Sequence, residues 1–397
     1  MNKMFLAATP VLEKIEKAGF EAYFVGGAVR DHLLNRDIHD VDIATSATPE
    51  EIKKIFSSTV DVGIEHGTIL VLFNGQGFEV TTFRSESDYE DFRRPQSVTF
   101  IRSLHEDLRR RDFTMNAIAM DRAGNLIDPY NGKMAIDNKI IETVGEAAER
   151  FKEDALRVMR AIRFVSQLGF SLEQKTEREM ANLSYLLKHI SVERITAEMT
   201  KLLNGTYREK ALKIAIETNI YSFWPTLFND KSIIKSILSL PIKPLNEIEL
   251  WILTVYLTDE TNSNELLRKW KLPSKKIQFI LRSLSLLQRR KDHEWTKYEY
   301  YRAGIEISTI VERTYQASRN KDISEIESNI HNIFKQLPIT SREDLTISGK
   351  DILKWCEKPA GPWVRVIMEG IEEAIINNEI YNEAAEIKRW VKSCHLP

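Results

Sequence analysis

The spacing of apolar residues changes near residue 145, and this change constrains the fold more than any other feature. Before it, short apolar runs alternate with helical stretches, and four runs have the composition of strands: residues 21–27, 39–44, 68–73 and 78–83. The last two flank Asn74-Gly75, a pair typical of a tight hairpin turn. From residue 146 onward the apolar period is helical almost throughout. The pattern predicts an α+β chain, with a sheet-containing N-terminal domain and a nearly all-helical remainder.

Length and composition indicate a multidomain protein. A chain of 397 residues exceeds what one hydrophobic core usually organises. Its two cysteines, Cys356 and Cys394, form no CxxC pair and no disulfide framework, which suits a reducing compartment. The N-terminal apolar segment is too short for a signal peptide, and no window approaches the roughly 18 apolar residues of a membrane span. We therefore expect a soluble cytoplasmic protein with no membrane partner.

Two aspartates stand one residue apart in the segment HDVDIA, residues 39–44. Side chains alternate between the faces of a strand, so Asp40 and Asp42 should share one face while Val41 and Ile43 pack into the sheet. Adjacent carboxylates repel each other, and bound Mg²⁺ removes that repulsion through the hard oxygen ligands that it prefers. Two such ions would serve in-line nucleotidyl transfer. The alternative is an exposed edge strand whose aspartates only limit aggregation.

A glycine pair precedes these aspartates, in the segment GGAVRD, residues 26–31. Gly26 and Gly27 allow the backbone to approach a ligand, and the following helix offers free N–H groups to phosphate at its N-terminus. Arg30, one turn into that helix, can clamp triphosphate oxygens. The spacing matches neither GxGxxG nor GxxxxGK(S/T), which argues against a dinucleotide or Walker-type site. A plain tight turn is the alternative explanation for the glycines.

The strand, the glycine pair, the helix and the paired aspartates together resemble the nucleotidyltransferase superfamily that includes DNA polymerase beta. That resemblance implies a third carboxylate on a neighbouring strand. Glu79, in the segment FEVTTFR, is the candidate, either as a metal ligand or as a base near the primer hydroxyl. An exposed strand residue without such a role is the alternative.

Further segments narrow the resemblance: LRRRDFTMNAIAMD, LIDPYNG, EDALRVMRAIRF and ISVERITAEMTKLL follow in this order. They resemble class II tRNA nucleotidyltransferases, the CCA-adding enzymes, and bacterial poly(A) polymerases share most of them. The resemblance implies four parts: a mixed-sheet nucleotidyltransferase head over 1–145, a helical neck that recognises the base over 146–205, an RNA-binding body over 206–300 and a tRNA-binding tail over 301–397.

The same resemblance implies roles for particular side chains. Gly27, Arg30 and Arg111 would hold the phosphates and sugar of the nucleotide, with Arg111 chosen from the run Arg109–Arg111 by its place in the motif. The segment 84–100, dense in charges and aromatic residues, is expected to be a mobile loop of the kind that complete CCA-adding enzymes carry there. A disordered excursion without a role is the alternative.

Two further features downstream of the arginine run are expected to be structural. Asp112 and Asn116 are expected to hold the turn after the arginines through side-chain to backbone bonds. The segment DPYNG, residues 128–132, is typical of a turn that separates the sheet from the helices.

Polar residues recur every three positions in EDALRVMRAIRF and are expected on one helix face: Asp154, Arg157, Arg160 and Arg163. A carboxylate can accept from an exocyclic amino group while a guanidinium donates to the adjacent ring nitrogen, a pattern that cytosine and adenine satisfy and that uracil and guanine reverse. Asp154 and Arg157 would thus read the base, with Arg160 and Arg163 in support and Glu153 orienting Arg157. A solvated salt-bridge ladder is the alternative.

These inferences predict a Mg²⁺-dependent enzyme that adds C, C and A from CTP and ATP to the 3′ end of tRNA and releases pyrophosphate. Basic and aromatic stretches of the helical rear suit an RNA surface, although core aromatics and solvated lysines explain them nearly as well. Poly(A) polymerase is the nearest alternative, and a non-catalytic RNA-binding protein on the same fold is another. A homodimer is compatible with the sequence.

Overall fold

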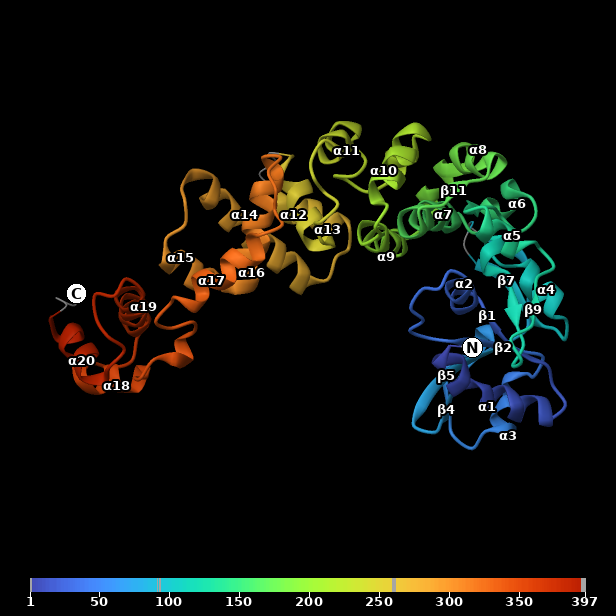
Figure 1. Ribbon diagram of the computed structural model, residues 1–397, viewed down its shortest axis with the longest axis horizontal. Coiled ribbons are helices and arrows are strands. Elements are labelled where there is room, and N and C mark those ends of the chain that lie inside the picture. Colours follow the sequence, from blue (N-terminus) through green and yellow to red (C-terminus); the bar gives the residue numbers. More distant parts are fainter. Residues whose placement is uncertain (1, 91, 93, 259–261, 394–397) are drawn as a thin grey trace. The chain divides into compact units, whose positions relative to one another are not determined.

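Figure 1 shows the computed structural model of the chain, which describes residues 2–90, 92, 94–258 and 262–393. The chain divides into two compact units, Met1–Ile234 with Lys269–Lys271 and Lys235–Arg268 with Leu272–Pro397. The finer division into head, neck, body and tail stays a prediction. Within the described part of the chain, none of the helices combines the length and the apolar character that crossing a bilayer requires.

Seven strands of the first unit, counted within the described residues, form one sheet in the order β3-β4-β5-β2-β1-β8-β9. Neighbouring strands are antiparallel except β2 and β5, which run parallel, so the sheet is mixed as predicted. The strands are β1 (Ala22–Val25), β2 (Asp42–Thr45), β3 (Thr59–Gly63), β4 (Thr68–Phe73), β5 (Gln76–Thr82), β8 (Ala119–Met120) and β9 (Leu126–Ile127).

The predicted hairpin joins β4 to β5. Phe73 pairs with Gln76, and the two residues between them both have positive φ, 49° at Asn74 and 76° at Gly75. This is the two-residue turn whose twist matches that of the strands it connects. The Asn-Gly pair therefore fixes the register of β4 against β5.

One face of the sheet is buried as the alternation predicts. Ile43, Ile69 and Val80 have no exposed surface. Helix α1 (Lys3–Lys17) covers this face, since the rings of Phe5 and Phe24 lie 4.8 Å apart. Helix α3 (Pro49–Ile55) also packs on it, next to β4. The residues of opposite parity, Asp42 among them, consequently point to the other face.

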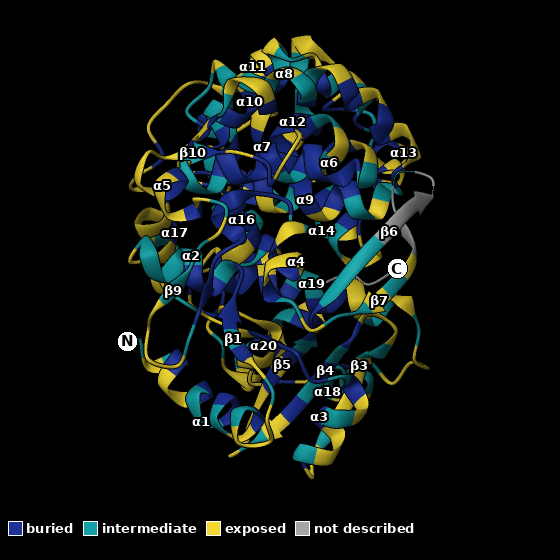
Figure 2. Cartoon of the chain, turned by 90° about the vertical axis from the view of Figure 1, so that its right-hand side faces the viewer, coloured by how far each residue is buried: buried dark blue, intermediate teal, exposed yellow. Residues whose placement is uncertain are grey.

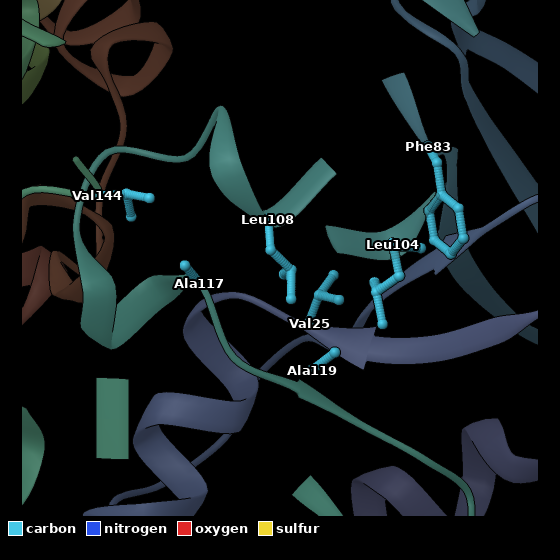
Figure 3. Packing of buried hydrophobic residues seen from close by; sticks show 8 residues of the cluster. Val25, Phe83, Leu104, Leu108, Ala117, Ala119 and Val144 are labelled. Atoms are coloured by element: carbon cyan, nitrogen blue, oxygen red, sulfur yellow. The ribbon is translucent and has the colours of Figure 1, made fainter. Parts of the chain in front are cut away.

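Part of that other face is covered by α4 (Leu104–Arg109). Figure 3 shows Leu104 and Leu108 of this helix packed against Val25 and Ala119 of the strands. The arginine run begins at Arg109, the last residue of α4, so the hydrophobic contact brings it to the sheet. Helix α2 (Gly27–Leu33) begins one residue after the end of β1, with Gly26 between them.

Residues 84–100, expected to be a mobile loop, form two antiparallel strands instead. β6 (Arg84–Glu90) pairs with β7 (Arg94–Phe100) from Arg84↔Phe100 to Glu90↔Arg94. Asp91 and Arg93 lie outside the described residues. Backbone pairing satisfies the polar groups that the two strands direct toward each other, and the Arg84 N–H donates to Asp107 Oδ1 at 3.3 Å. The expectation of a loop was wrong because it weighed charge and overlooked the β-forming residues of 97–100.

The segment EDALRVMRAIRF is also not one helix. α6 (Ala147–Glu153) ends before Asp154, whose backbone is extended with φ −134° and ψ 102°, and α7 (Leu156–Leu168) follows. Asp154 Oδ1 accepts from the Leu156 N–H at 3.1 Å, a local bond that competes with helix continuation. α7 packs against α9 (Val192–Leu203) and α10 (Arg208–Glu217) and is buried along most of its length (Figure 2).

The described residues contain further short elements and helices. In the first unit these are α5 (Gly132–Asp137), β10 (Ile140–Ile141), β11 (Ser171–Leu172), α8 (Gln174–Leu183), η1 (Ile64–His66), η2 (Thr114–Asn116), η3 (Ser184–His189) and η4 (Ile220–Phe223). The helix α11 (Lys231–Leu238) follows them. The remaining helices are α12 (Glu247–Tyr256), α13 (Ser263–Lys269), α14 (Ser274–Asp292), α15 (Lys297–Ala303), α16 (Ile305–Ser318), α17 (Ile326–Lys335), η5 (Arg342–Asp344), α18 (Gly349–Cys356), α19 (Pro362–Ile376) and α20 (Ala384–Ser393).

Candidate active site

A cavity of about 430 Å³ in the first unit collects most of the predicted site residues. The start of α2, the start of β2, the loop after α4 and the first turns of α7 contribute to its walls. Eight predicted residues line it: Gly27, Arg30, Asp42, Arg111, Asp154, Arg157, Arg160 and Arg163. Six others line it as well: Gly26, Glu86, Arg110, Asp112, Asn116 and Phe164. Asp40 and Glu79 lie outside this lining.

Asp42, the first residue of β2, lies between the other two predicted carboxylates, Asp40 on its own chain segment and Glu79 on β5. Asp42 pairs in register with Glu79 on the parallel neighbour β5, so both side chains point to the same face of the sheet. Asp40 precedes the strand, which means that strand alternation does not position it as predicted. Burial raises the pKa of Asp42, and the negative charges of Asp40 and Glu79 raise it further, while Arg111 lowers it. Asp42 therefore lies close enough to Asp40 and to Glu79 to be repelled by both.

The residues that the structure describes contain no group of three or more His, Cys, Asp or Glu side chains placed to hold a metal ion by themselves. The donor set at Asp42 is nevertheless of the kind that a hard divalent cation prefers, because it consists of carboxylate oxygens. An ion there would reduce the repulsion that raises the pKa of Asp42. The carboxylates thus fit a cation that takes its other ligands from a substrate.

Gly26 is more constrained than Gly27, which the motif singled out. Its φ is +72°, and a Cβ at this position would lie 3.3 Å from Arg111 Nη1 and 3.7 Å from Asp42 Oδ2. Gly27 has an ordinary φ, and a Cβ there would lie 3.6 Å from Arg30 Nη2. Only glycine adopts the backbone of residue 26 without strain, and only glycine leaves the gap between Asp42 and Arg111 open.

Replacement of Gly26 by alanine should lower the activity of this site by about 10- to 100-fold, because the methyl group displaces Arg111 or Asp42 by contact. The matched control is Gly304→Ala, which has a φ of +80° and no atom within 4 Å of its Cβ. The control should lose stability by about 1–3 kcal/mol without a comparable loss of activity. Equal activity losses in the two variants would contradict the steric explanation.

Two arginines at the glycine end of the cavity are held by neighbouring side chains. Arg30 makes two hydrogen bonds to Asp31, at 3.0 and 2.9 Å, and donates from Nη1 to Asn116 Oδ1 at 2.7 Å. Arg111 donates from Nη2 to Asp107 Oδ2 at 3.2 Å. Asp107 is only 1% exposed and also pairs with Arg110. Burial raises the pKa of Asp107, but the guanidiniums of Arg110 and Arg111 outweigh burial and lower it.

Asp107 was not among the predicted site residues, although its spacing from Arg110 and Arg111 indicates a contact with both. An acid at i,i+3 from Arg110 and i,i+4 from Arg111 is the arrangement expected to orient both arginines from one helix. Asp112 was predicted only to hold the turn. It does accept from the Phe113 N–H at 2.8 Å and from Asn116 Nδ2 at 3.0 Å, and its other oxygen also binds Arg160.

At the other end of the cavity, Arg194 holds Asp154. The Arg194 guanidinium contacts both carboxylate oxygens, with Nη2 2.8 Å from Oδ2 and Nη1 3.3 Å from Oδ1. Arg194 belongs to α9 and lies 40 residues further along the chain. Arg194 lies in the segment ISVERITAEMTKLL, and no role was predicted for it from the sequence. The pairing fixes Asp154 in its extended conformation between α6 and α7.

Arg157 is 7% exposed and is oriented from two sides. Its Nη1 donates to Glu153 Oε2 at 2.7 Å, which is the contact predicted from their spacing. Its Nη2 donates to the backbone carbonyl of Arg110 at 2.9 Å. The loop after α4 is thereby tied to the arginine that was predicted to read the base.

Arg160 and Arg163 form the cavity wall beside these residues. Arg160 Nε donates to Asp112 Oδ2 at 2.7 Å, and Arg163 Nε lies 2.5 Å from Glu198 Oε2. Burial lowers the pKa of Arg163 to about 10. The ring of Phe164 lies 3.8 Å from the guanidinium carbon of Arg163. Paired and stacked, these arginines have few conformations to lose when an anion or a base binds.

Three known families match successive parts of the chain. Residues 22–142 match the family described as the Poly A polymerase head domain, and residues 169–229 match one described as a probable RNA and SrmB-binding site of polymerase A. Residues 242–391 match a putative tRNA nucleotidyltransferase domain 2. The first match contains the glycine pair, the aspartates and the arginine run.

Relatives that match this chain over nearly its whole length include CCA-adding enzymes. A CCA-adding enzyme of Bacillus cereus is 46% identical over 99% of this chain and 100% of its own length. The crystal structure of the Bacillus stearothermophilus CCA-adding enzyme in complex with CTP has a TM-score of 0.86 at 42% identity and covers 99% of this chain and 98% of that one. A Thermotoga maritima CCA-adding enzyme shares the fold at 18% identity, with a TM-score of 0.63 over 99% of this chain and 96% of that one. The chain therefore belongs to the family of CCA-adding enzymes, which are nucleotidyltransferases.

Proposed function

We propose that the cavity binds CTP and ATP in turn and adds C, C and A to the 3′ end of tRNA, with release of pyrophosphate. The observation that carries the proposal is the meeting of two different groups in one cavity. Asp42, in register with Glu79, suits a divalent cation that binds a triphosphate, and the pair Asp154–Arg157 suits the recognition of a base. The similarity to a CCA-adding enzyme solved with CTP supports the same assignment.

In this proposal Asp40 and Asp42 hold Mg²⁺, and Glu79 either completes the ligand set or accepts the proton of the primer hydroxyl. The ion, when bound, supplies positive charge at the triphosphate and at the attacking oxygen. Mg²⁺ commonly binds through one or two carboxylates together with substrate phosphates, so three protein ligands are not required. Burial raises the pKa of Asp42 and the negative charges of Asp40 and Glu79 raise it further, and a bound cation would favour the charged carboxylate against both effects, which supports the assignment.

The phosphates and the sugar of the nucleotide would lie at the glycine end. Gly26 and Gly27 leave room for them, and Arg30 and Arg111 point guanidinium groups into the same space. Because Asp31, Asn116 and Asp107 already orient these arginines, little conformational entropy is lost when the triphosphate binds.

The base would lie between Asp154 and Arg157. Oδ2 of Asp154 accepts one bond, from Arg194, and retains capacity for the amino group of cytosine or adenine. Nη2 of Arg157 donates one proton to the Arg110 carbonyl and has a second for the neighbouring ring nitrogen. Uracil and guanine reverse both polarities, and each unpaired group costs about 1–3 kcal/mol. This pair would therefore select C and A without a nucleic-acid template.

Arg194→Met should reduce the preference for CTP over UTP by about tenfold, because Asp154 loses the partner that orients it. The metal-dependent chemistry should stay intact. The matched control is Arg178→Met, which removes an exposed arginine that pairs with Glu179. The measurement is the ratio of kcat/KM for the two nucleotides in each variant. An unchanged ratio in folded Arg194→Met would exclude a positioning role for Arg194.

The assay that tests the proposed function uses tRNA lacking its 3′ CCA, Mg²⁺, and each nucleoside triphosphate alone and in pairs, followed by sequencing of the product ends. We expect addition that stops after C, C and A when CTP and ATP are both present. Long A tails from ATP alone would indicate a poly(A) polymerase instead. No addition in any mixture, with tRNA still bound, would indicate a non-catalytic RNA-binding protein.

The RNA would be held outside the cavity, by the helices assigned to the body and tail. The match of residues 242–391 to a tRNA nucleotidyltransferase domain supports this part of the proposal. Recognition there would rest on the shape and phosphates of the acceptor stem, because a stem common to many tRNAs offers no constant sequence to read.

A further inference from the structure

We infer that an exposed apolar surface on the sheet, formed by Val60 of β3 with Leu70 and Leu72 of β4, binds the sugar and base of the last nucleotide of the tRNA primer. We call these three residues the β3–β4 surface. The inference rests on the proposed function, and it assigns a place to the nucleotide that carries the attacking hydroxyl.

Strand register connects this surface to the carboxylates. Asp42 pairs with Glu79, Glu79 pairs with Leu70, and Leu70 pairs with Val60. Register partners on neighbouring strands point to the same face of a sheet. One row therefore crosses β2, β5, β4 and β3, with two carboxylates at one end and two aliphatic side chains at the other.

Two contacts confirm which side chains share this face. Thr68 Oγ1 of β4 lies 3.1 Å from Thr81 Oγ1 of β5, so the even residues of β4 meet the odd residues of β5. A Cβ on Gly77 would lie 3.2 Å from Leu70 Cδ1, which shows that Leu70 leans across the face toward β5. The residues of opposite parity, Ile69 and Val71, are completely buried on the face covered by α1 and α3.

The β3–β4 surface is exposed, although apolar side chains normally gain free energy by burial. Val60 is 45% exposed and Leu72 is 44% exposed, and the adjacent Val62 is 52% exposed. On the same face of the sheet, α4 buries Val25. A contiguous apolar patch beside a reaction centre is typical of a surface that a substrate covers.

The geometry of transfer points to the primer as the occupant. In-line displacement places the attacking hydroxyl and the departing pyrophosphate on opposite sides of the reacting phosphorus. Gly26 and Arg111, which would hold the phosphates, lie on the β1 side of Asp42. The hydroxyl must then approach from the side of Glu79, and the nucleotide that carries it lies over β5, β4 and β3.

The chemistry of the surface also suits a primer end. Its terminal base is the last base of the trimmed tRNA before the first addition and C before the second and third, because each product is the primer of the following step. Aliphatic side chains contact the faces of ribose and base without reading hydrogen-bond donors or acceptors, so they tolerate every base. A surface of hydrogen-bonding groups would favour one terminal base and slow the other steps.

The test combines Val60→Ser with Leu72→Ser in one variant. We expect kcat/KM for tRNA lacking CCA to fall about tenfold, with KM for CTP unchanged, since only the primer loses contacts. The matched control is Leu6→Ser on α1, where the leucine is 58% exposed. The control should change neither parameter. A rise in KM for CTP equal to that for tRNA, or no change in a folded double variant, would overturn the inference.

A second measurement uses the unaltered protein and so does not depend on the folding of a variant. A tRNA whose last nucleotide is 4-thiouridine is irradiated in the complex, and the crosslinked peptide is identified. We expect the crosslink within residues 59–73, and a crosslink found solely within 235–397 overturns the inference. If sedimentation instead shows that the double variant converts a dimer to a monomer, the surface joins two copies of the chain. Failure of the wild-type protein to extend tRNA at all would count against the proposed function. The double variant and the crosslink test only the place of the primer, so the two failures can be told apart.

Discussion

Replacement of Asp42 by alanine should abolish nucleotide addition, with a loss of about 1,000-fold or more, equivalent to about 4 kcal/mol of transition-state stabilisation. Asp42 is the carboxylate that both lines the cavity and pairs in register with Glu79, so no neighbour can replace it in both contacts. Binding of tRNA should remain within about twofold of wild type, because the residue would serve the triphosphate and the hydroxyl rather than the body of the RNA. Single-turnover rates and a gel-shift titration measure the two quantities.

Asp40→Ala should also abolish addition if it is a metal ligand. Its position before β2 makes this variant the sharper test of the ligand set. The matched control for both is Asp137→Ala, which removes an exposed aspartate paired with Lys133 on α5. Retention of more than about a tenth of the wild-type rate by Asp42→Ala would be too much activity for a metal ligand and would refute its assignment.

The parts of the fold that follow from local sequence could be predicted. The Asn74-Gly75 turn and the strands beside it depend on residues within the hairpin, and the hairpin lies where it was expected. The neighbourhood of Asp42 and Glu79 was inferred from a superfamily resemblance, and the parallel register of β2 and β5 agrees with it. Their chemical roles stay predictions.

The parts that depend on distant residues could not be predicted in the same way. Periodicity cannot reveal that Asp154 leaves the helix, because its extended backbone is held by Arg194 from 40 residues away and by its own bond to Leu156. The strands of 84–100 were missed since charged residues concealed an alternating pattern. The importance of Gly26 could not be predicted, because the side chain that a Cβ there would contact belongs to Arg111, 85 positions further along the chain.

The arrangement around Asp154 changes what its removal should do. On a continuous helix, the residue would have been one member of a row of charges. It instead stands at a break between two helices and lines the cavity, and Arg194 binds both of its oxygens. Its carboxylate is thus oriented by the protein before the nucleotide binds, and this preorganisation is what base selection by hydrogen-bond polarity requires.

Asp154→Ala should therefore lower the CTP:UTP and ATP:GTP ratios of kcat/KM by about 10- to 100-fold, which corresponds to about 1–3 kcal/mol for the acceptor that no longer opposes O4 or O6. Activity should fall without vanishing, because Asp42 and the arginines of the triphosphate site are untouched. Asp154→Asn is the matched variant, since its amide keeps the volume and can donate a hydrogen bond. It should accept UTP at least as well as Asp154→Ala does.

A salt-bridge ladder without a role in recognition predicts a different result. Loss of the Asp154–Arg194 pair would then lower the melting temperature of both variants and leave the two nucleotide ratios at their wild-type values. Melting curves measured beside the ratios separate the two accounts, because only a role in base recognition predicts a change in the nucleotide ratios of a folded variant. Wild-type ratios in a folded and active Asp154→Asn protein would show that the base is selected elsewhere in the cavity, with Arg157 as the next residue to replace.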